Sequence, residues 1–299
     1  MNATGDKLEL LQINLLDQHR EVVTVLRQLA DSLGLEFGWH YLLDLTWILC
    51  QLGSIKGKRI LDAGAGTGIL QWYLAEYGAT IISADRTSRA NLPLRFRTRF
   101  NVQGLRKKDL TPYPQVIKSN LSRQISFTAR LGQQAMDLAR GSTWKRSPGK
   151  VLIYNQDLRS LPDIPDQSLD AIVAVSALEH NQPEDLEVVV AELMRVLKPG
   201  GILAASLNAA PEDWWHAPSS GWCYSEASLR RVFQLDPEVR SNYDRYPEIL
   251  QSIRDSAELR DNLARFYFRS DQNGMPWGKW DPQYVPVGIC KVKALKATD

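Results

Sequence analysis

A glycine-rich turn between two apolar strands constrains the fold of this chain more than any other feature of its sequence. Residues 59–62 form a short apolar strand, 69–77 form a helical stretch, and 79–84 form a second apolar strand. The turn before the helix holds a glycine at every second position: Gly64, Gly66 and Gly68. This order is a βαβ unit, which requires two parallel strands joined by a right-handed crossover. The sequence therefore predicts an α/β fold with a doubly wound, mostly parallel sheet.

The rest of the chain continues this alternation and adds helices at its N-terminal end. Apolar residues at helical spacing predict a helix from Leu8 to Leu33 and a second helix over 39–52. Further strands are predicted at 151–154, 170–175, 202–206 and 284–292. Pro286 in the last of these favours an edge position or a bulge, because proline cannot donate to a strand ladder. We expect a sheet of seven strands.

A basic insertion interrupts the alternation after the second strand. Asp85 and Asp157 are 72 residues apart, although a helix, two loops and a strand need only about 27. Residues 86–150 carry ten Arg and five Lys against two Asp, a net charge of +13. Such a segment favours an anionic partner, and a solvated basic face is the simpler alternative.

These observations divide the chain into two parts. We expect an N-terminal helical segment over 1–53 and a main domain over 54–299, with the insertion at about 88–149. An aromatic-rich lid is predicted at about 207–283. No signal peptide, membrane span or metal-binding cysteine spacing is recognisable, so we expect a cytoplasmic protein without a metal.

The glycine-rich turn closely resembles the first motif of class I S-adenosylmethionine-dependent methyltransferases. A dinucleotide-binding turn would need a small residue where this chain has Ile69. Residues 155–158, 161–180 and 193–201 are similar to the type-11 branch of these methyltransferases, the branch like the ubiquinone and menaquinone methyltransferases. The resemblance covers roughly residues 55–85 and 150–206, and it implies a Rossmann-like methyltransferase fold.

The resemblance also implies a cofactor and the residues that hold it. S-adenosyl-L-methionine is the expected cofactor, with Asp62 at its methionine amino end, Asp85 at the ribose hydroxyls and Asp157 beside the adenine. The complete set of expected cofactor residues is Asp62, Gly64, Gly66, Gly68, Asp85, Asp157, Leu158 and Ser176.

The loop after the fourth strand borders the transferred methyl group in the family. A sulfonium methyl is already activated, so a general base is needed only if the acceptor is protonated, as a hydroxyl is. His180 is a candidate base, and Glu179 is expected to orient it. The alternative is that His180 only packs in the loop. Residues 176–179 also lack the Asn/Asp-Pro-Pro-aromatic pattern of enzymes that methylate nucleobase amines.

Three segments are candidates for the acceptor site, although core packing or a solvated face could explain each of them. Two are aromatic, over 39–41 and 214–216. In the third, Arg95, Arg97 and Arg99 alternate with phenylalanines, which predicts guanidinium groups on one side of an extended segment. The expected acceptor-binding residues are Trp39, His40, Tyr41, Arg95, Arg97, Trp215 and His216.

The preferred function is methyl transfer to a small-molecule, glycan or natural-product acceptor. O-methylation is expected, and the insertion favours an anionic acceptor. One alternative is an RNA methyltransferase that uses the insertion as its basic footprint, although binding to nucleic acid is not the expectation. Another is a non-catalytic, S-adenosylmethionine-binding regulatory partner. The sequence leaves the oligomeric state open.

Overall fold

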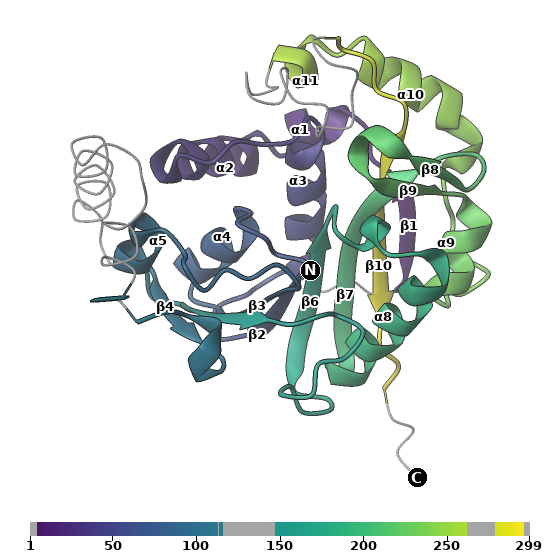
Figure 1. Cartoon of the computed structure of the whole chain (residues 1–299). Helices are drawn as coiled ribbons and strands as arrows, with labels where there is room; N and C mark the ends of the chain where they lie inside the picture. Colours follow the sequence, from purple (N-terminus) through teal and green to yellow (C-terminus); the bar gives the residue numbers. More distant parts are fainter. Residues whose placement is uncertain (1–4, 113, 116–146, 262–278, 296–299) are drawn as a thin grey trace.

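One large sheet lies at the centre of the computed structural model, which describes residues 5–112, 114–115, 147–261 and 279–295 (Figure 1). Ten strands form the sheet in this part of the chain. They are β1 (Lys7–Leu10), β2 (Arg59–Ala63), β3 (Thr80–Asp85), β4 (Asn101–Gly104), β5 (Lys150–Asn155), β6 (Leu169–Val175), β7 (Leu197–Ala209), β8 (Trp214–His216), β9 (Gly221–Tyr224) and β10 (Val285–Val292).

The strand order is β1-β10-β7-β6-β2-β3-β5-β4, and β8 and β9 form a hairpin that joins at β7. The six strands from β7 to β4 pair in parallel. β10 is antiparallel to β7, and β1 is antiparallel to β10. The prediction of a doubly wound, mostly parallel sheet is confirmed, but the expected total of seven strands is wrong.

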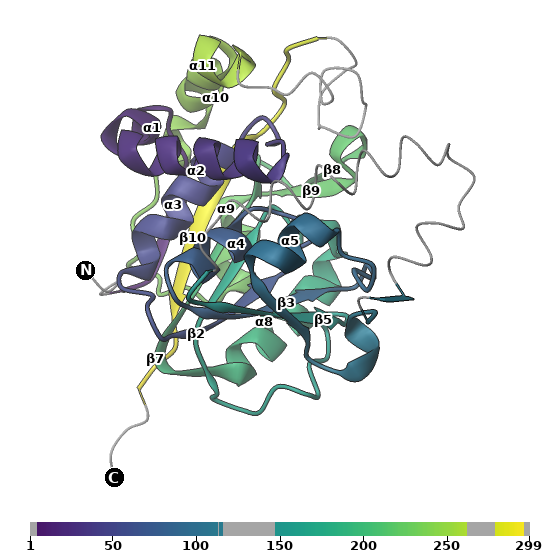
Figure 2. The same cartoon turned by 90° about the vertical axis from the view of Figure 1, so that its left-hand side faces the viewer.

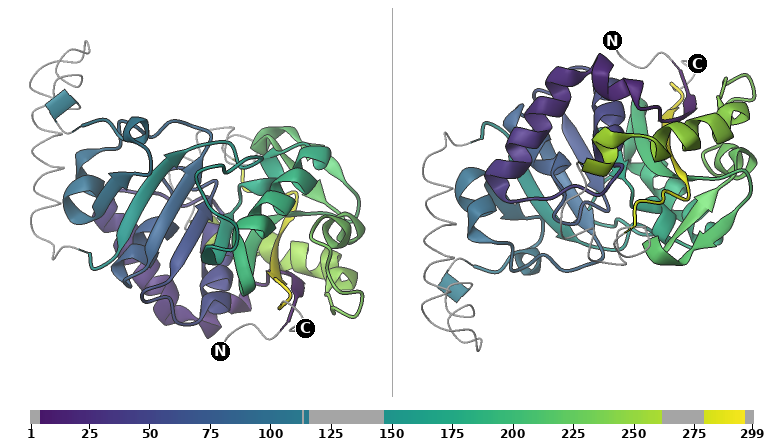
Figure 3. Two further views of the ribbon diagram at one scale, coloured as in Figure 1. Left: turned by 90° about the horizontal axis from the view of Figure 1, so that it is seen from below. Right: turned by 90° about the horizontal axis from the view of Figure 1, so that it is seen from above.

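Helices cover both faces of the sheet (Figures 2 and 3). They are α1 (Asn14–Gln18), α2 (Arg20–Leu33), α3 (Tyr41–Leu52), α4 (Leu70–Glu76), α5 (Leu94–Arg99), α8 (Pro183–Val196), α9 (Glu226–Val232), α10 (Tyr246–Arg254) and α11 (Ala257–Asp261). In the described parts of the chain, none of the helices has both the length and the apolar character needed to cross a bilayer.

The direction of winding reverses between β2 and β6. The connection from β2 through α4 to β3 moves towards one edge of the sheet, whereas the connection from β6 through α8 to β7 moves towards the other. Because both crossovers are right-handed, α4 and α8 lie on opposite faces. The reversal opens a crevice at the carboxyl ends of β2 and β6, where sheets of this kind bind their ligands.

The N-terminal segment is not one helix, because it begins with strand β1. Leu8 and Leu10 are buried and Lys7 and Glu9 are exposed, which is the alternation of a half-buried strand. The predicted helix therefore starts late, at α1, and breaks at His19 before α2. Strand β1 also covers β10, so β10 is not an edge strand. Pro286 lies one position beyond the pairs between β10 and β1.

The basic insertion is described at its two ends, and residues 116–146 lie outside the described residues. Its first part forms α5 and the edge strand β4. The segment that contains Arg95, Arg97 and Arg99 is therefore helical, and the prediction of an extended segment is wrong. Phe96 and Phe100 are four residues apart and pack together on Trp72 of α4, with ring centroids 4.7 and 4.8 Å away.

Candidate active site

The glycine turn adopts a backbone that only glycine accommodates at its first position. Gly64 has a φ of +75°, and a Cβ built there would lie 2.4 Å from the Cβ of Ala177. The backbone N–H groups of Gly64 and Ala65 donate to the carbonyl of Ala84 in β3. Asp85 fixes the next residue, because its Oδ2 accepts a hydrogen bond of 2.8 Å from Gly66 N. The turn thus keeps an open backbone surface beside the crevice.

Asp62 lies at the end of β2, under the turn, and only 3% of its surface is exposed. Burial raises its pKa to about 7, and the nearby Arg89 opposes this rise. A buried carboxylate in this position can bind a cationic group strongly, because there is little water to compete.

Arg89 is a functional candidate that the sequence did not reveal. Its guanidinium is buried and donates to the carbonyl of Gly66 at 3.0 Å and to the side chain and carbonyl of Ser83. Its backbone N–H donates to Asn155 Oδ1. Arg89 therefore ties the glycine turn to β3 through its guanidinium, and its backbone N–H adds a bond to β5. No local motif identifies it, because its partners come from three separate segments.

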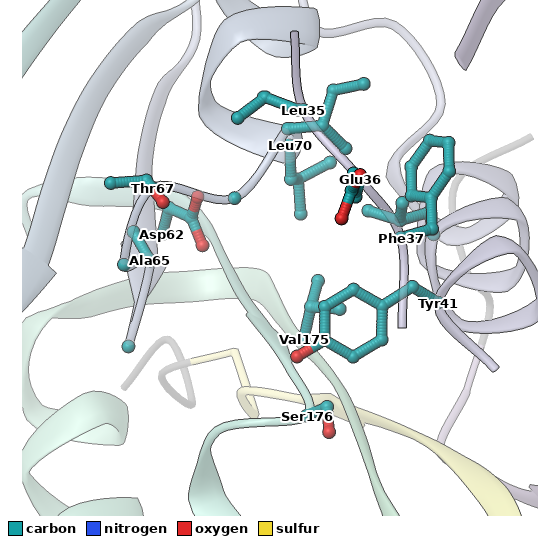
Figure 4. A pocket seen from close by; sticks show the side chains of 15 residues that line it. Leu35, Glu36, Phe37, Tyr41, Asp62, Ala65, Thr67, Leu70, Val175 and Ser176 are labelled. Atoms are coloured by element: carbon teal, nitrogen blue, oxygen red, sulfur yellow. The ribbon is translucent and has the colours of Figure 1, made fainter. Parts of the chain in front are cut away.

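A cavity of about 230 Å³ opens between the glycine turn and the loop before α3, and we call it the glycine-loop cavity (Figure 4). Asp62 lies on one side of it, Glu36 and Tyr41 on the opposite side, and Val175 and Ser176 at the end of β6. No sequence pattern pointed to the loop before α3, which adds three lining residues: Leu35, Glu36 and Phe37.

A second cavity, of about 290 Å³, continues from the first along the strand ends, and we call it the acidic cavity. Asp85, Asp157, Leu158 and His180 line it. Asp157 also forms an ion pair with Arg159, whose side chain donates to both carboxylate oxygens. This pairing lowers the pKa of Asp157, so the carboxylate is ionised at neutral pH. The two cavities share three lining residues: Tyr41, Gly64 and Ser176.

A third space, of about 70 Å³, lies behind Tyr41 and Ser176, and we call it the buried chamber. Its walls come from the start of α3, the loop after β6, β7, the β8–β9 hairpin and the segment before β10. They are Gly38, Trp39, His40, Tyr41, Ser176, Glu179, His180, Asn208, Ser219 and Tyr284.

His40 is held in the chamber wall through both of its ring nitrogens. Nδ1 lies 2.6 Å from Oδ2 of the buried Asp44, and Nε2 lies 3.3 Å from the hydroxyl of Tyr284. His216 packs behind this pair, with its ring centroid 5.2 Å from that of Tyr284. Because it supports Tyr284 rather than lining the chamber, the structure places His216 in a second layer.

The loop after β6 is arranged differently from the expectation. Ser176 has a φ of +44°, and its hydroxyl donates to Glu179 Oε1 at 2.5 Å. The exposed His180 is oriented by Ser220, because its Nδ1 lies 2.8 Å from that carbonyl oxygen. A carbonyl only accepts, so Nδ1 carries the proton and Nε2 is the basic nitrogen. The orienting bond therefore comes from Ser220, and the expectation that Glu179 orients His180 is wrong.

Several predicted acceptor residues lie away from these three cavities. Arg97 donates to the carbonyl of Thr111, and Arg99 pairs with Glu76 of α4. Arg95 stacks on the ring of Phe96, and none of the three arginines lines the glycine-loop cavity, the acidic cavity or the chamber. Trp215 is 42% exposed on the hairpin and contacts Trp222. The structure thus brings Trp39, His40 and Tyr41 to the site, but not these residues.

The cavities fit the three parts of S-adenosylmethionine. The cofactor joins a methionine with a cationic amino group to a ribose with two hydroxyls and an adenine. A buried carboxylate beside a bare glycine backbone suits the first part, and two carboxylates in the next cavity suit the hydroxyls and the base. Among the described residues, no group of three or more His, Cys, Asp and Glu side chains could hold a metal ion.

Known proteins with similar sequences are methyltransferases. Residues 125–205 match the type-11 family of methyltransferase domains. The ubiquinone biosynthesis O-methyltransferase of Pasteurella multocida is 23% identical over 220 residues, which cover 73% of this chain and 72% of that protein.

Solved structures share the fold at lower sequence identity. The (4+2)-cyclase SpnF superposes with a TM-score of 0.50 at 17% identity, covering 96% of this chain and 99% of that one. Phosphoethanolamine N-methyltransferase 2 of Haemonchus contortus has a TM-score of 0.49 at 17% identity, covering 94% of this chain and 59% of that one. These similarities concern the fold alone. We conclude that this chain is an S-adenosylmethionine-dependent methyltransferase of class I, with similarity to the type-11 family over residues 125–205.

Proposed function

We propose that this enzyme transfers a methyl group to a hydroxyl of a small-molecule, glycan or natural-product acceptor in the cytoplasm. The observation that carries the proposal is the loop after β6, which presents a basic nitrogen and a buried carboxylate at the meeting point of the three cavities. The O-methyltransferase of Pasteurella multocida supports the choice of oxygen. A hydroxyl needs a proton acceptor, whereas an amine free of its proton does not.

The cofactor roles follow the two larger cavities. We assign Asp62 to the amino group of the methionine part, and the glycines Gly64, Gly66 and Gly68 to its backbone contacts. Asp85 takes the ribose hydroxyls, and Asp157 with Leu158 takes the adenine. Ser176 lies at the junction of both cavities, beside the reacting end.

S-adenosylmethionine supplies a methyl group on a sulfonium, whose leaving group is a neutral thioether. The protein then has two tasks, which are to hold the acceptor oxygen in line and to exclude water. The buried chamber suits the first task, because the buried side chains of Trp39, His40 and Tyr284 line it with aromatic surface. His180 Nε2 and Glu179 are the two candidate proton acceptors. We also propose that the insertion recognises an anionic part of the acceptor. The residues that do so would be insertion residues that do not line the three cavities.

Methyl transfer to a panel of acceptors would test this function. Isotope-labelled S-adenosylmethionine would be incubated with hydroxylated small molecules and sugars, with their amine analogues and with RNA. We expect product from hydroxyl acceptors, with a higher rate when they carry a phosphate or carboxylate. Labelling of amine analogues alone would contradict O-methylation. Labelling of RNA alone, with binding that weakens steeply with salt, would favour an RNA methyltransferase.

A further inference from the structure

The position of the buried chamber connects it with the reacting end of the cofactor. The sulfonium of S-adenosylmethionine joins the methionine part to the ribose part. In this protein the glycine-loop cavity meets the acidic cavity at Tyr41, Gly64 and Ser176. Two of these residues, Tyr41 and Ser176, also line the chamber. The chamber therefore borders the place where the two cofactor cavities meet.

Glu179 carries an unused oxygen in the wall of this chamber. Its side chain is 1% exposed, and Oε1 accepts a hydrogen bond of 2.5 Å from Ser176. Oε2 is fully buried and has no hydrogen-bond partner among the described residues. A buried carboxylate oxygen without a partner is costly, because it has lost its water and gained nothing in return. Such an oxygen either carries a proton or awaits a ligand.

Among the residues that the structure describes, the groups around Glu179 do not supply a permanent positive charge. The titratable groups that interact with it come from α3, η2 (Leu178–His180), β9 and the segment before β10, and they are His40, His180, Cys223, Tyr224 and Tyr284. Of these, only the two histidines can become cationic. His40 already faces the carboxylate of Asp44, and His180 lies at the exposed rim. Burial raises the pKa of Glu179. The nearby His180 and the hydrogen bond from Ser176 oppose this rise. Without a ligand, the buried carboxyl is stabilised in its protonated form.

We propose that Glu179 is the catalytic proton acceptor for the acceptor's hydroxyl group, and that the positive charge of the bound methyl donor ionises it in advance. This inference rests on the proposed function, because it needs a hydroxyl acceptor. It differs from the expectation that Glu179 orients His180, since Glu179 itself would contact the reacting group through Oε2. His180 would then remain at the rim of the chamber.

The charges balance through the reaction. Binding of the donor brings one positive charge and releases the proton of Glu179 to solvent. The acceptor oxygen then forms a bond to the methyl carbon, and the carbon–sulfur bond breaks with its electron pair staying on sulfur. The hydroxyl proton passes to Glu179 Oε2. A cation and an anion in a dry site become a neutral thioether and a neutral carboxyl, which low dielectric favours.

Proton counting by calorimetry would test the inference without an acceptor. S-adenosylmethionine and S-adenosylhomocysteine differ by one methyl group and one positive charge. Titration of each into the protein, in buffers of different ionisation enthalpy and across the neutral pH range, gives the number of protons released. We expect the donor to release up to one more proton than the product. Any ionisation of Asp62 occurs with both ligands and cancels in the difference.

Two variants make the outcome specific. Glu179→Gln keeps the shape and the bond from Ser176, and we expect it to abolish the difference between the two ligands. Glu184→Gln changes an exposed glutamate at the start of α8 and should leave the difference as in the wild type. If Glu179→Gln does not fold, infrared difference spectra of the wild type serve instead: a protonated-carboxyl band that remains with the product should disappear with the donor, whereas a band of Asp62 would disappear with both.

The possible failures are distinguishable. If both ligands bind and release equal numbers of protons, or if the difference survives in Glu179→Gln, the role of Glu179 is overturned and the proposed function stands. If neither ligand binds, the proposed cofactor site fails together with this inference.

Discussion

The two halves of the crevice are built in different ways. The cofactor half is centred on one contiguous stretch, from Asp62 through the glycine turn to Leu70, and the segment around the start of α3 and the ends of β3, β5 and β6 complete it. The buried chamber is assembled from five separate parts of the chain, and its His40 and Tyr284 are 244 positions apart. The first half depends on backbone shape, whereas the second depends on the chemistry of a few buried side chains.

This difference predicts different responses to mutation. A side chain added in the glycine turn should weaken cofactor binding by displacing the structure around it, with little dependence on its polarity. An isosteric change in the chamber should leave binding of the cofactor intact and alter proton transfer.

The largest expected effect is in the chamber. With an acceptor found by the panel above, Glu179→Gln should lower kcat roughly 100-fold or more, the usual scale for a lost general base. His180→Ala should lower kcat less than tenfold, since its ring lies at the exposed rim. Steady-state kinetics of both variants, with cofactor affinity measured in parallel, would check this. The reverse order of the two losses would return the role of base to His180.

A smaller effect is expected in the glycine turn. Gly64→Ala should weaken binding of S-adenosylhomocysteine roughly 10- to 100-fold, because the new methyl group meets Ala177. Gly57 is a matched control, since it also has a positive φ, of +76°, but open space around its Cβ position. Gly57→Ala should lower the melting temperature slightly and leave the affinity unchanged. Equal losses in both variants would mean that backbone strain, rather than contact, governs the site.

Cofactor affinity should also depend on pH through Asp62. Its pKa is about 7 in the free protein, and a cationic amino group needs the ionised form. Affinity should therefore fall about tenfold per unit as the pH drops below 7, and level off above it. Arg89→Met removes the cation that opposes the rise in the pKa of Asp62, so the fall should begin at a higher pH. Calorimetry of S-adenosylhomocysteine binding over this pH range would check this, with Asp62→Asn as a control whose affinity should not depend on pH. If the affinity of the wild type does not depend on pH either, the assignment of Asp62 is wrong.

The smallest effect is expected outside both halves. Arg95→Gln combined with Arg97→Gln should change the acceptor KM by no more than about twofold, because neither side chain lines the three cavities. An increase of tenfold would show that α5 takes part in acceptor recognition after all. Arg99→Gln is a contrasting variant. It should lower stability, because it removes the buried guanidinium that forms an ion pair with Glu76.

The residues that the sequence predicted for the cofactor do line the two larger cavities, because their signals are local. The glycines, Asp62 and Asp85 lie in one βαβ unit, and the strand ends of such a unit meet in space by necessity. The chamber was predicted only in part. Trp39, His40 and Tyr41 are recognisable as an aromatic segment, but Tyr284 and Asn208 carry no local signal that pairs them with it.

The errors have physical causes as well. Strand β1 was hidden within leucines that also fit a helical period, and its pairing with β10 is a long-range contact. The arginines of α5 were predicted as extended, although Phe96 and Phe100 at a spacing of four indicated a helix packed on α4. Arg89 binds three segments at once, which no pattern in a single segment reveals.

Ligand binding to the wild type and two variants is the most direct test of the central claim, that the strand ends of β2 and β3 hold S-adenosylmethionine. Calorimetry would compare S-adenosylmethionine, S-adenosylhomocysteine and NAD without added metal. We expect both sulfur compounds to bind and NAD not to bind. Asp62→Ala and Asp85→Ala should each weaken binding by roughly 1.5–3 kcal/mol, the scale of a charged hydrogen bond. Unchanged affinity in both variants, or a preference for NAD, would contradict the account.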